Sequence, residues 1–290
     1  MLIQRNALAL IRGCRSWLLD AEGSTRPLGL FRVLLILLLW ARFAQEMALW
    51  NQETPAQAAL GAAFFILTTL ALVGWHTRRA MVLLAGVLAL VHYNIGLHGG
   101  YAPFTHHHVY LLMVCTVLCA MGPCERSFSL DRVLALRRGQ ARPEQGSLLA
   151  NRLLLLQLMA VYFWTAVDKT NMAFLSGVRL DQVLHFHYYE SFLAPFVLWG
   201  PGIVAASILV VVVEYFLAIG ILLGRWQRLV LGLAVVLHGV FYVLLPVQTF
   251  SLTMLALYLF VVSPDRVHRV VHLLVADADR SIGSASGPWK

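Results

Sequence analysis

Long apolar runs, separated by short polar loops, follow one another through almost the whole chain. Eight of them lie near the ~20 residues that a helix needs to cross a bilayer. They cover residues 28–46, 57–75, 80–97, 108–122, 151–169, 203–223, 226–245 and 249–263. The run 108–122 is short, so it needs tilt or neighbouring protein to cross. The pattern predicts an all-α, polytopic transmembrane helix bundle of about eight spans.

Two further segments are apolar but do not fit a membrane span. "SFLAPFVLWG" (191–200) is too short and contains Pro195, which favours an interfacial or re-entrant segment. "NALALIRGCRSWLLDA" (6–21) mixes charges with apolar residues, which predicts an N-terminal amphipathic helix on the membrane surface. We therefore expect three parts: a cytoplasmic amphipathic segment (1–27), a bundle (28–264) and a basic cytoplasmic tail with a disordered end (265–290).

Composition and charge agree with a membrane protein. The chain is 60% hydrophobic and 12% charged, which is about half the charge of an average soluble domain. Its net charge of +8 comes from arginines in alternate loops, and the loops between them carry at most Arg179. By the positive-inside rule, both termini lie in the cytoplasm of a bacterial-type inner (plasma) membrane. The basic surplus then reflects topology, so we expect the lipid bilayer as partner and no nucleic acid.

Ionisable residues at membrane depth are costly, so each is a candidate functional residue. At ~1.5 Å of rise per residue, several fall in the half of the membrane away from the cytoplasm or in the adjoining outer segment. These outer-side candidates are Arg42, His106, His107, His108, Lys169, His185 and His187. We therefore expect an active site that faces outside.

Lys169 ends the fifth run, where Tyr162 lies on the same helical face by i, i+7 spacing. An ammonium group in a low-dielectric pocket loses solvation, which favours the neutral amine and makes it a usable base. The alternative is a lysine that snorkels from a helix end to the interface. Asp168 points about 100° away on a helix, so its adjacency does not make it the partner of Lys169.

Two other groupings remain open from the residues alone. Glu214 and His238 fall near mid-membrane on successive runs, which predicts an intramembrane pair that locks the bundle, with a proton relay as the alternative. His106, His107 and His185 are candidate metal ligands, but adjacent residues on a helix diverge and no Cys/His spacing fixes a geometry. We expect no metal site.

Four motifs carry a resemblance to a known family. They are "RPLGLFRVLLILLL" (26–39), "HHVYLLM" (107–113), "SFSLDRVL" (127–134) and "VYFWTAVDKTNMAFLSG" (161–177). In order and spacing, with Glu214, His238 and "FSLTML" (250–255) following, they resemble the HTTM family, the transmembrane domain shared with vitamin K-dependent gamma-glutamyl carboxylase. The resemblance covers about residues 26 to 264.

The resemblance implies an integral membrane enzyme with carboxylase-like (lyase or oxidoreductase) chemistry. Lys169 would be the catalytic base and His108 its polar helper, acting on vitamin K hydroquinone or another lipid quinol, or on an exported peptide. Arg42, Tyr110, Tyr162 and His187 would bind the substrate or quinone, and Gly177 would form the turn that returns the chain to this site.

The sequence also departs from the carboxylase pattern. Asp168 stands where the carboxylase has a lysine, and the large lumenal region that binds glutamate-rich substrates has no counterpart after the last span. Two other classes therefore stay open. One is a non-catalytic membrane subunit for maturation or export of a partner peptide, and the other is a DoxX-like quinone-linked redox subunit.

Overall fold

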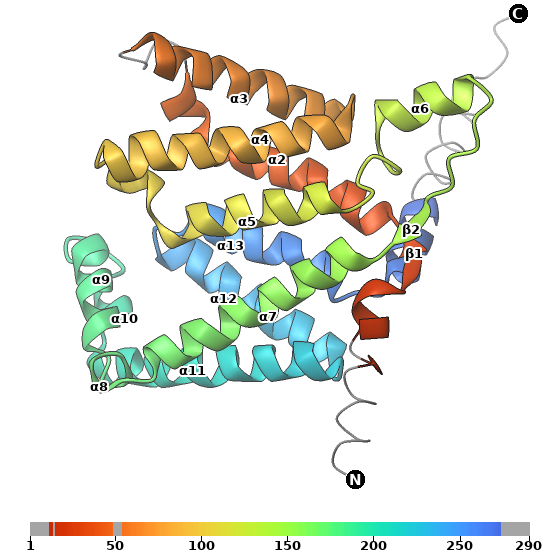
Figure 1. The fold of residues 1–290 in the computed structure, drawn as a ribbon. Helices are drawn as coiled ribbons and strands as arrows, with labels where there is room; N and C mark the ends of the chain where they lie inside the picture. Colours follow the sequence, from red (N-terminus) through yellow and green to blue (C-terminus); the bar gives the residue numbers. More distant parts are fainter. Residues whose placement is uncertain (1–11, 14, 49–53, 274–290) are drawn as a thin grey trace, which may run out of the picture. The chain divides into compact units, whose positions relative to one another are not determined.

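The computed structural model describes residues 12–13, 15–48 and 54–273. The chain forms two compact units: residues 154–261 make up the second, and the residues before and after them make up the first. Figure 1 labels the elements of both units. Of the predicted amphipathic segment, residues 12–13 and 15–19 are helical. Most of the rest of that segment, like the tail from residue 274, lies outside the described residues.

Four helices form the body of the first unit: α2 (Arg26–Met47), α3 (Pro55–Val73), α4 (Thr77–Val91) and α5 (His107–Met121). α2 packs on α3 and α5, and α4 packs on α3 and α5. Phe31, Leu35, Leu39 and Phe43 recur every fourth residue along α2 and are at most 1% exposed. This spacing places them on one face of the helix, and that face forms the core of the unit.

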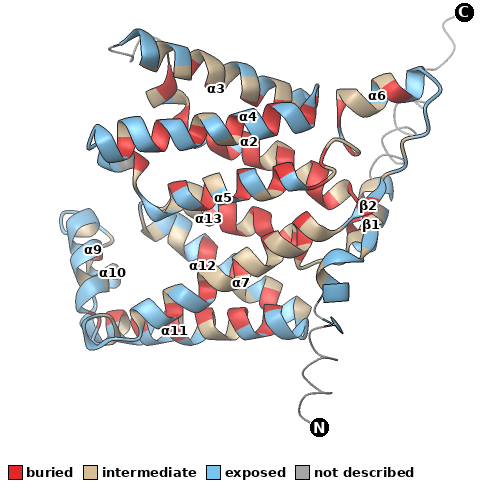
Figure 2. Ribbon diagram, in the orientation of Figure 1, coloured by how far each residue is buried: buried red, intermediate tan, exposed pale blue. Residues whose placement is uncertain are grey.

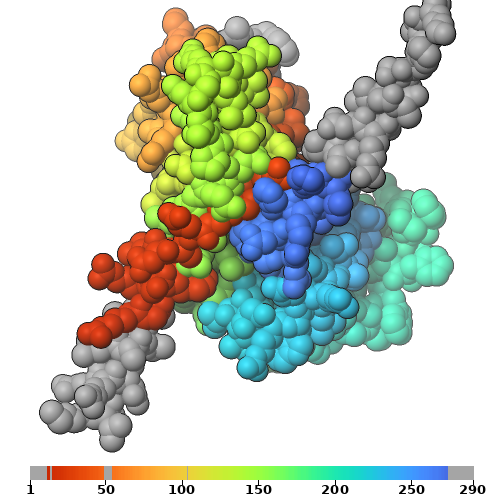
Figure 3. Space-filling model, turned by 90° about the vertical axis from the view of Figure 1, so that its right-hand side faces the viewer, coloured from red at the N-terminus to blue at the C-terminus, as the bar shows by residue number. Residues whose placement is uncertain are grey.

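Shorter elements complete the first unit. They are a π-helix (His92–His98), a 3₁₀ turn (Ala102–Phe104), α6 (Leu130–Arg137), and the strands β1 (Glu22–Ser24) and β2 (Gln145–Ser147). β1 pairs antiparallel with β2, with Gly23 opposite Gly146. Figure 3 shows the red start of α2 beside the blue residues after 262, where Arg26 donates to the carbonyl of His268. Strands of three residues carry no detectable periodicity, so the sequence pattern did not predict them.

The second unit is also helical. Its elements are α7 (Leu149–Lys169), α8 (Met172–Leu175), α9 (Val178–Tyr188), α10 (Ala194–Val197), α11 (Gly200–Leu223), α12 (Gln227–Leu244), α13 (Gln248–Leu257) and a 3₁₀ turn (Tyr258–Phe260). α12 packs between α11 and α13. Gly177 precedes α9 with φ of +85°, a left-handed conformation that favours glycine, so the predicted turn is confirmed.

All eight apolar runs form helices in the described part of the chain. Six of these are long and apolar enough to cross a membrane: Arg26–Met47, Pro55–Val73, Thr77–His98, Leu149–Lys169, Gly200–Leu223 and Gln227–Leu244. The last run forms a seventh if the helices Gln248–Phe260 and Pro264–Leu273 are counted as one broken span. α5, as expected, is short at 15 residues. The all-α polytopic fold is confirmed.

The helices leave much apolar surface uncovered. On α12, Val235, Val236 and Val243 are 59%, 63% and 70% exposed, and Figure 2 shows similar exposed stretches along α3 and α11. A water-soluble protein rarely exposes contiguous apolar surface on this scale. These faces are suited to contact with lipid chains.

Candidate functional site

A large apolar pocket lies within the second unit. Its volume is about 780 Å³, within the range typical of small-molecule sites. Its walls come mainly from apolar side chains of α9, α11, α12 and α13, including Leu180, Ile203, Val240, Phe241, Leu244 and Phe250. Lys169, Arg179 and Gln182 supply the polar groups. We call this cavity the Lys169 pocket.

Lys169 reaches the pocket as half of an ion pair. Its Nζ lies 2.5 Å from Oε1 of Glu214, which is only 3% exposed on α11. The same Nζ lies 5.8 Å from the ring centre of Phe174 and 6.0 Å from that of Phe241. Asp168, in contrast, is exposed. The lysine head therefore lies among apolar side chains and is paired with a buried acid.

A second polar chain is buried in the same unit. The hydroxyl of Tyr258 donates to the hydroxyl of Tyr162 at 3.0 Å, and Tyr162 Oη lies 2.7 Å from Nε2 of His238. Tyr162 accepts from Tyr258, which leaves its own proton available to His238. In the tautomer that uses this proton, Nε2 of His238 accepts and the neutral ring carries its proton on Nδ1.

These contacts correct the predicted pair of Glu214 with His238. Glu214 binds Lys169, and His238 binds Tyr162. The reason is that α7 presents Tyr162 and Lys169 on one face, two turns apart, so this helix supplies a separate partner to each residue. The prediction rested on the similar depths of Glu214 and His238 in the membrane. Depth alone does not show which residues of α7 face them.

Two polar atoms of this arrangement remain without a hydrogen bond among the described residues. They are Oε2 of Glu214 and Nδ1 of His238, and both are buried. One is an acceptor and the other, in the tautomer derived above, is a donor. Buried polar atoms of this kind normally have a partner, so a hydroxyl group or a water molecule is expected beside each.

The first unit holds the remaining membrane-depth candidates. Arg42 forms an ion pair with Glu46 at 2.8 Å, and its charge also acts on the half-buried His108. The rings of His106 and His108 stack at 5.2 Å. Tyr110 is exposed on α5 and contacts the ring of His92 edge-on. Arg42 therefore acts electrostatically on His108, while the expected role of His108 as the polar helper of Lys169 stays a prediction.

The histidines of α9 do not reach the Lys169 pocket. His187 is exposed and is not among the lining residues. His185 Nδ1 lies 3.0 Å from Asp181 one turn earlier, on the exposed face of the helix. Within the described residues, no three His, Cys, Asp or Glu side chains gather as metal ligands would.

Some residues of the site could not be identified from the sequence. Tyr258 lay in the last apolar run as an ordinary aromatic residue, yet it ends the buried chain. In the first unit, Arg32 is fully buried and donates to the carbonyls of Cys124 at 2.9 Å and Phe128 at 2.5 Å. Arg32 stands in the first of the four motifs that carry the family resemblance, but nothing in the sequence indicated these contacts.

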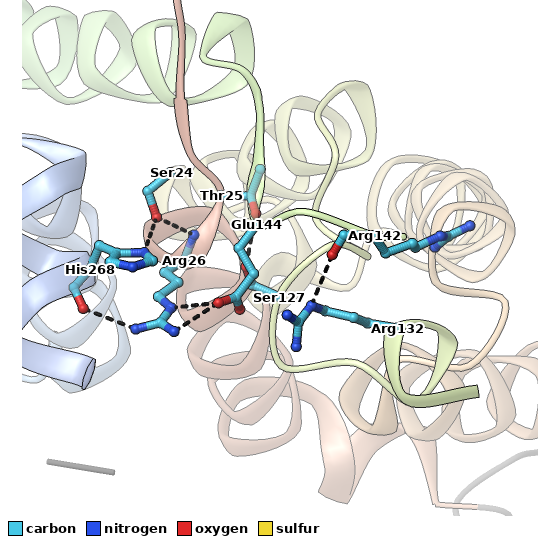
Figure 4. A network of polar contacts seen from close by, with 8 residues as sticks. All are labelled: Ser24, Thr25, Arg26, Ser127, Arg132, Arg142, Glu144 and His268. Carbon is cyan, nitrogen blue, oxygen red and sulfur yellow. Dashed lines mark hydrogen bonds and ion pairs between the residues drawn. The ribbon is translucent and has the colours of Figure 1, made fainter. Parts of the chain in front are cut away.

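A second network anchors the start of α2. The guanidinium of Arg26 forms an ion pair with Glu144 at 2.8 Å, and Ser24 hydrogen-bonds the ring of His268 at 3.2 Å (Figure 4). Burial alone would raise the pKa of Glu144, but the bond and charge of Arg26 outweigh it and hold that pKa below its usual value. This network is structural, because it joins chain segments far apart in sequence.

Comparison with known proteins gives one clear relationship. No curated protein and no solved structure matches the chain. A family model described as the HTTM domain matches residues 24–266, which include all six of the long apolar helices described above. Because this match covers most of its length, the chain belongs to the HTTM domain family.

Proposed function

We propose that this HTTM protein is an integral membrane enzyme in which Lys169 and Glu214 act together as a base on a lipid quinol. The observation that carries the proposal is the ion pair of Lys169 and Glu214 at the wall of an apolar pocket of about 780 Å³. Apolar walls suit the ring and tail of such a molecule, and Lys169 is placed to meet a hydroxyl group. The bound quinol would supply an acidic hydroxyl and the redox chemistry.

The ion pair can remove a proton without a free amine in the resting state. As Nζ of Lys169 takes a proton from the bound hydroxyl, it passes one of its own to Oε1 of Glu214. The carboxylate becomes a neutral acid, and the ammonium group remains beside the new oxyanion. Stabilisation of developing charge by a fixed cation in a water-poor site is a strong catalytic effect.

His238, Tyr162 and Tyr258 offer a route for that proton. Each hydroxyl or ring nitrogen in their chain can give one proton while it accepts another. Among the described residues no hydrogen bond joins this chain to the Lys169–Glu214 pair. A water molecule that bonds both Oε2 of Glu214 and Nδ1 of His238, the two buried atoms without partners, would complete the proposed route.

The finer assignments follow the carboxylase resemblance. His108 and Arg42 would assist as a polar group, and the site would face the outside of a bacterial-type inner membrane with both termini cytoplasmic. Vitamin K hydroquinone is the first quinol to test, and an exported peptide is the candidate second substrate. Asp168 stands where the carboxylase has a lysine, so the proposal covers proton removal from the quinol and not the complete carboxylation reaction.

The test compares wild type with Lys169→Ala and Glu214→Gln in lipid nanodiscs. The readouts are oxygen consumption with vitamin K hydroquinone and, separately, quinone retained after purification, measured by mass spectrometry. Arg225→Gln is the matched control, because it removes a cation of the same unit outside the Lys169 pocket. We expect a loss of at least a hundredfold in rate for Lys169→Ala, in the range of general acid–base catalysis.

The two readouts separate the alternatives. Quinone retention without turnover in wild type would favour a redox subunit. Neither retention nor turnover in wild type, in correctly folded protein, would favour a non-catalytic subunit. Either result, or a Lys169→Ala rate equal to that of the Arg225→Gln control, would overturn the proposal.

A further inference from the structure

The first unit contains a cavity of its own, and its lining is polar and basic, unlike the apolar lining of the Lys169 pocket. It measures about 560 Å³ and lies between the start of α4 and the segment that carries α6. Four arginines line it: Arg78, Arg79, Arg138 and Arg142. Glu125 and Asp131 are its acidic residues. We call this cavity the arginine pocket.

The charge of Asp131 is already engaged. Its carboxylate accepts hydrogen bonds from the backbone of His76 at 2.9 Å, and from the backbone and hydroxyl of Thr77 at 2.8 and 2.7 Å. Burial alone would raise the pKa of Asp131, but these bonds outweigh it and lower that pKa. Asp131 therefore caps the start of α4. Among the described residues, none of the four lining arginines forms an ion pair.

The backbone of Arg142 is held by a hydrogen bond, but one nitrogen of its guanidinium group has no acceptor among the described residues. Nε of Arg132 donates to its carbonyl oxygen at 3.3 Å, and in Figure 4 its side chain extends away from the network around Glu144. Nη1 of Arg142 is buried and has no hydrogen-bond acceptor within the described residues. A buried guanidinium nitrogen without an acceptor carries a desolvation cost. Within the described residues, Oε2 of Glu125 in the same lining is also buried without a hydrogen bond. The cavity thus holds four guanidinium groups against a single carboxylate that is not already engaged, and this surplus of positive charge favours an anionic ligand.

The position of the cavity narrows the class of ligand. Thr77 begins a helix long enough to span the membrane, so Arg78 and Arg79 lie at a membrane–water boundary. The adjacent Trp75 is 45% exposed, as is common for tryptophans at that level. Phosphate groups of anionic lipids occupy the same level, and guanidinium groups bind phosphate oxygens through paired hydrogen bonds.

We propose that the arginine pocket binds the phosphate group of an anionic lipid headgroup. Such binding at one cavity differs from the general attraction between basic loops and an acidic membrane surface. That attraction would apply equally to exposed arginines outside the cavity, such as Arg137 and Arg269. The proposal does not depend on the chemistry proposed for Lys169.

The experiment measures lipid preference by native mass spectrometry from nanodiscs of mixed phosphatidylglycerol and phosphatidylcholine. The test variant is Arg78→Gln with Arg79→Gln, and the control is Arg137→Gln with Arg269→Gln, which removes the same charge outside the pocket. We expect wild type and control to retain phosphatidylglycerol preferentially. The test variant should lose about tenfold of that preference, which corresponds to ~1.4 kcal/mol.

Inorganic phosphate serves as the competing probe. We expect it to displace the lipid, because the pocket recognises the phosphate group itself. No displacement at saturating phosphate would show that another part of the lipid is recognised and would overturn the proposal. Equal loss in both double variants would show general charge attraction and overturn the proposal, as would no loss in either. A melting measurement on each variant confirms the fold, and Arg138→Gln provides an independent single change in the pocket.

Discussion

Glu214 is the residue on which the second unit's polar arrangement depends. It is buried, and one of its oxygens binds Lys169. Replacing one partner of such an ion pair leaves the other charge uncompensated in an apolar environment. Replacing both partners removes both charges, so no uncompensated charge remains. The two single changes and the double change at this pair should therefore give different results.

A double-mutant cycle of Lys169→Met and Glu214→Leu tests this coupling. We expect the double variant to be less destabilised than the sum of the single variants, by roughly 1–3 kcal/mol. The measurement is the free energy of unfolding in detergent. Strictly additive values would show that the ion pair contributes nothing to the fold.

The hydrogen-bonded chain of Tyr258, Tyr162 and His238 predicts which of two tyrosine substitutions costs more stability. Tyr162→Phe removes both the acceptor of Tyr258 and the donor to His238, while Tyr258→Phe removes only the terminal donor. We expect Tyr162→Phe to cost ~1–3 kcal/mol, and Tyr258→Phe to cost less. Thermal unfolding of the two variants side by side measures the difference, and the reverse order would contradict the derived direction of donation.

The sequence predicted individual residues of the site better than their contacts. Helical spacing correctly put Tyr162 and Lys169 on one face, because that depends only on α7. The partner of Lys169 depends on the rotation of α11 and α12 about their axes, which an almost uniformly apolar span does not encode. The Lys169 pocket was unpredictable for the same reason.

At the scale of elements, the turn between α3 and α4 is fixed by close packing. Gly74 has φ of +77°, and a Cβ there would lie 2.6 Å from Cα of Ser129 and 3.1 Å from Nη1 of Arg32. Arg32 in turn binds the backbone of residues 124 and 128. One glycine and one buried arginine thus join α2, the α3–α4 turn and the segment before α6.

Gly74→Ala should therefore destabilise the first unit by more than ~1 kcal/mol, because it adds both a left-handed alanine and a clash. Gly86→Ala is the matched control: Gly86 lies inside α4 with open space where a Cβ would be added, so alanine should stabilise the helix slightly. Melting temperatures should shift in opposite directions. A similar shift for both would contradict the packing argument.

Acid should weaken the anchoring of α4 and of the start of α2. The pKa values of Asp131 and Glu144 are lowered in the folded state. A lowered folded pKa contributes stability that is complete above the unfolded values of ~3.9 and ~4.3 and is lost as pH falls through the folded pKa. Asp131→Asn should reduce the slope of unfolding free energy against pH below ~4, and an unchanged slope would contradict this assignment.

For the whole molecule, the sequence predicted the class of fold but not its division into units. Apolar runs reliably mark spans, since lipid requires helices with satisfied backbones. The boundary near residue 154 falls inside α7, where neither composition nor a loop marks it. The predicted orientation in the membrane, in contrast, rests on charge alone and can be tested directly.

Cysteine labelling in intact cells tests that topology. Cys115, Cys119 and Cys124 are buried, so a background with Cys14→Ser should label weakly. Asp168→Cys should react with an impermeant maleimide from outside, and Arg138→Cys only after permeabilisation, since both positions are exposed. The opposite labelling pattern would invert the orientation and the proposed outward face of the site.

The shortness of α5 has a consequence for the membrane itself. Its 15 residues span roughly 22 Å, against a hydrocarbon thickness of ~30 Å. Lipids beside a helix this short compress, and the cost rises with each ångström of mismatch. Acyl-chain length should therefore act as a regulator: thin bilayers would relax the protein, and thick bilayers would draw water inward toward His107 and His108 at the start of the helix.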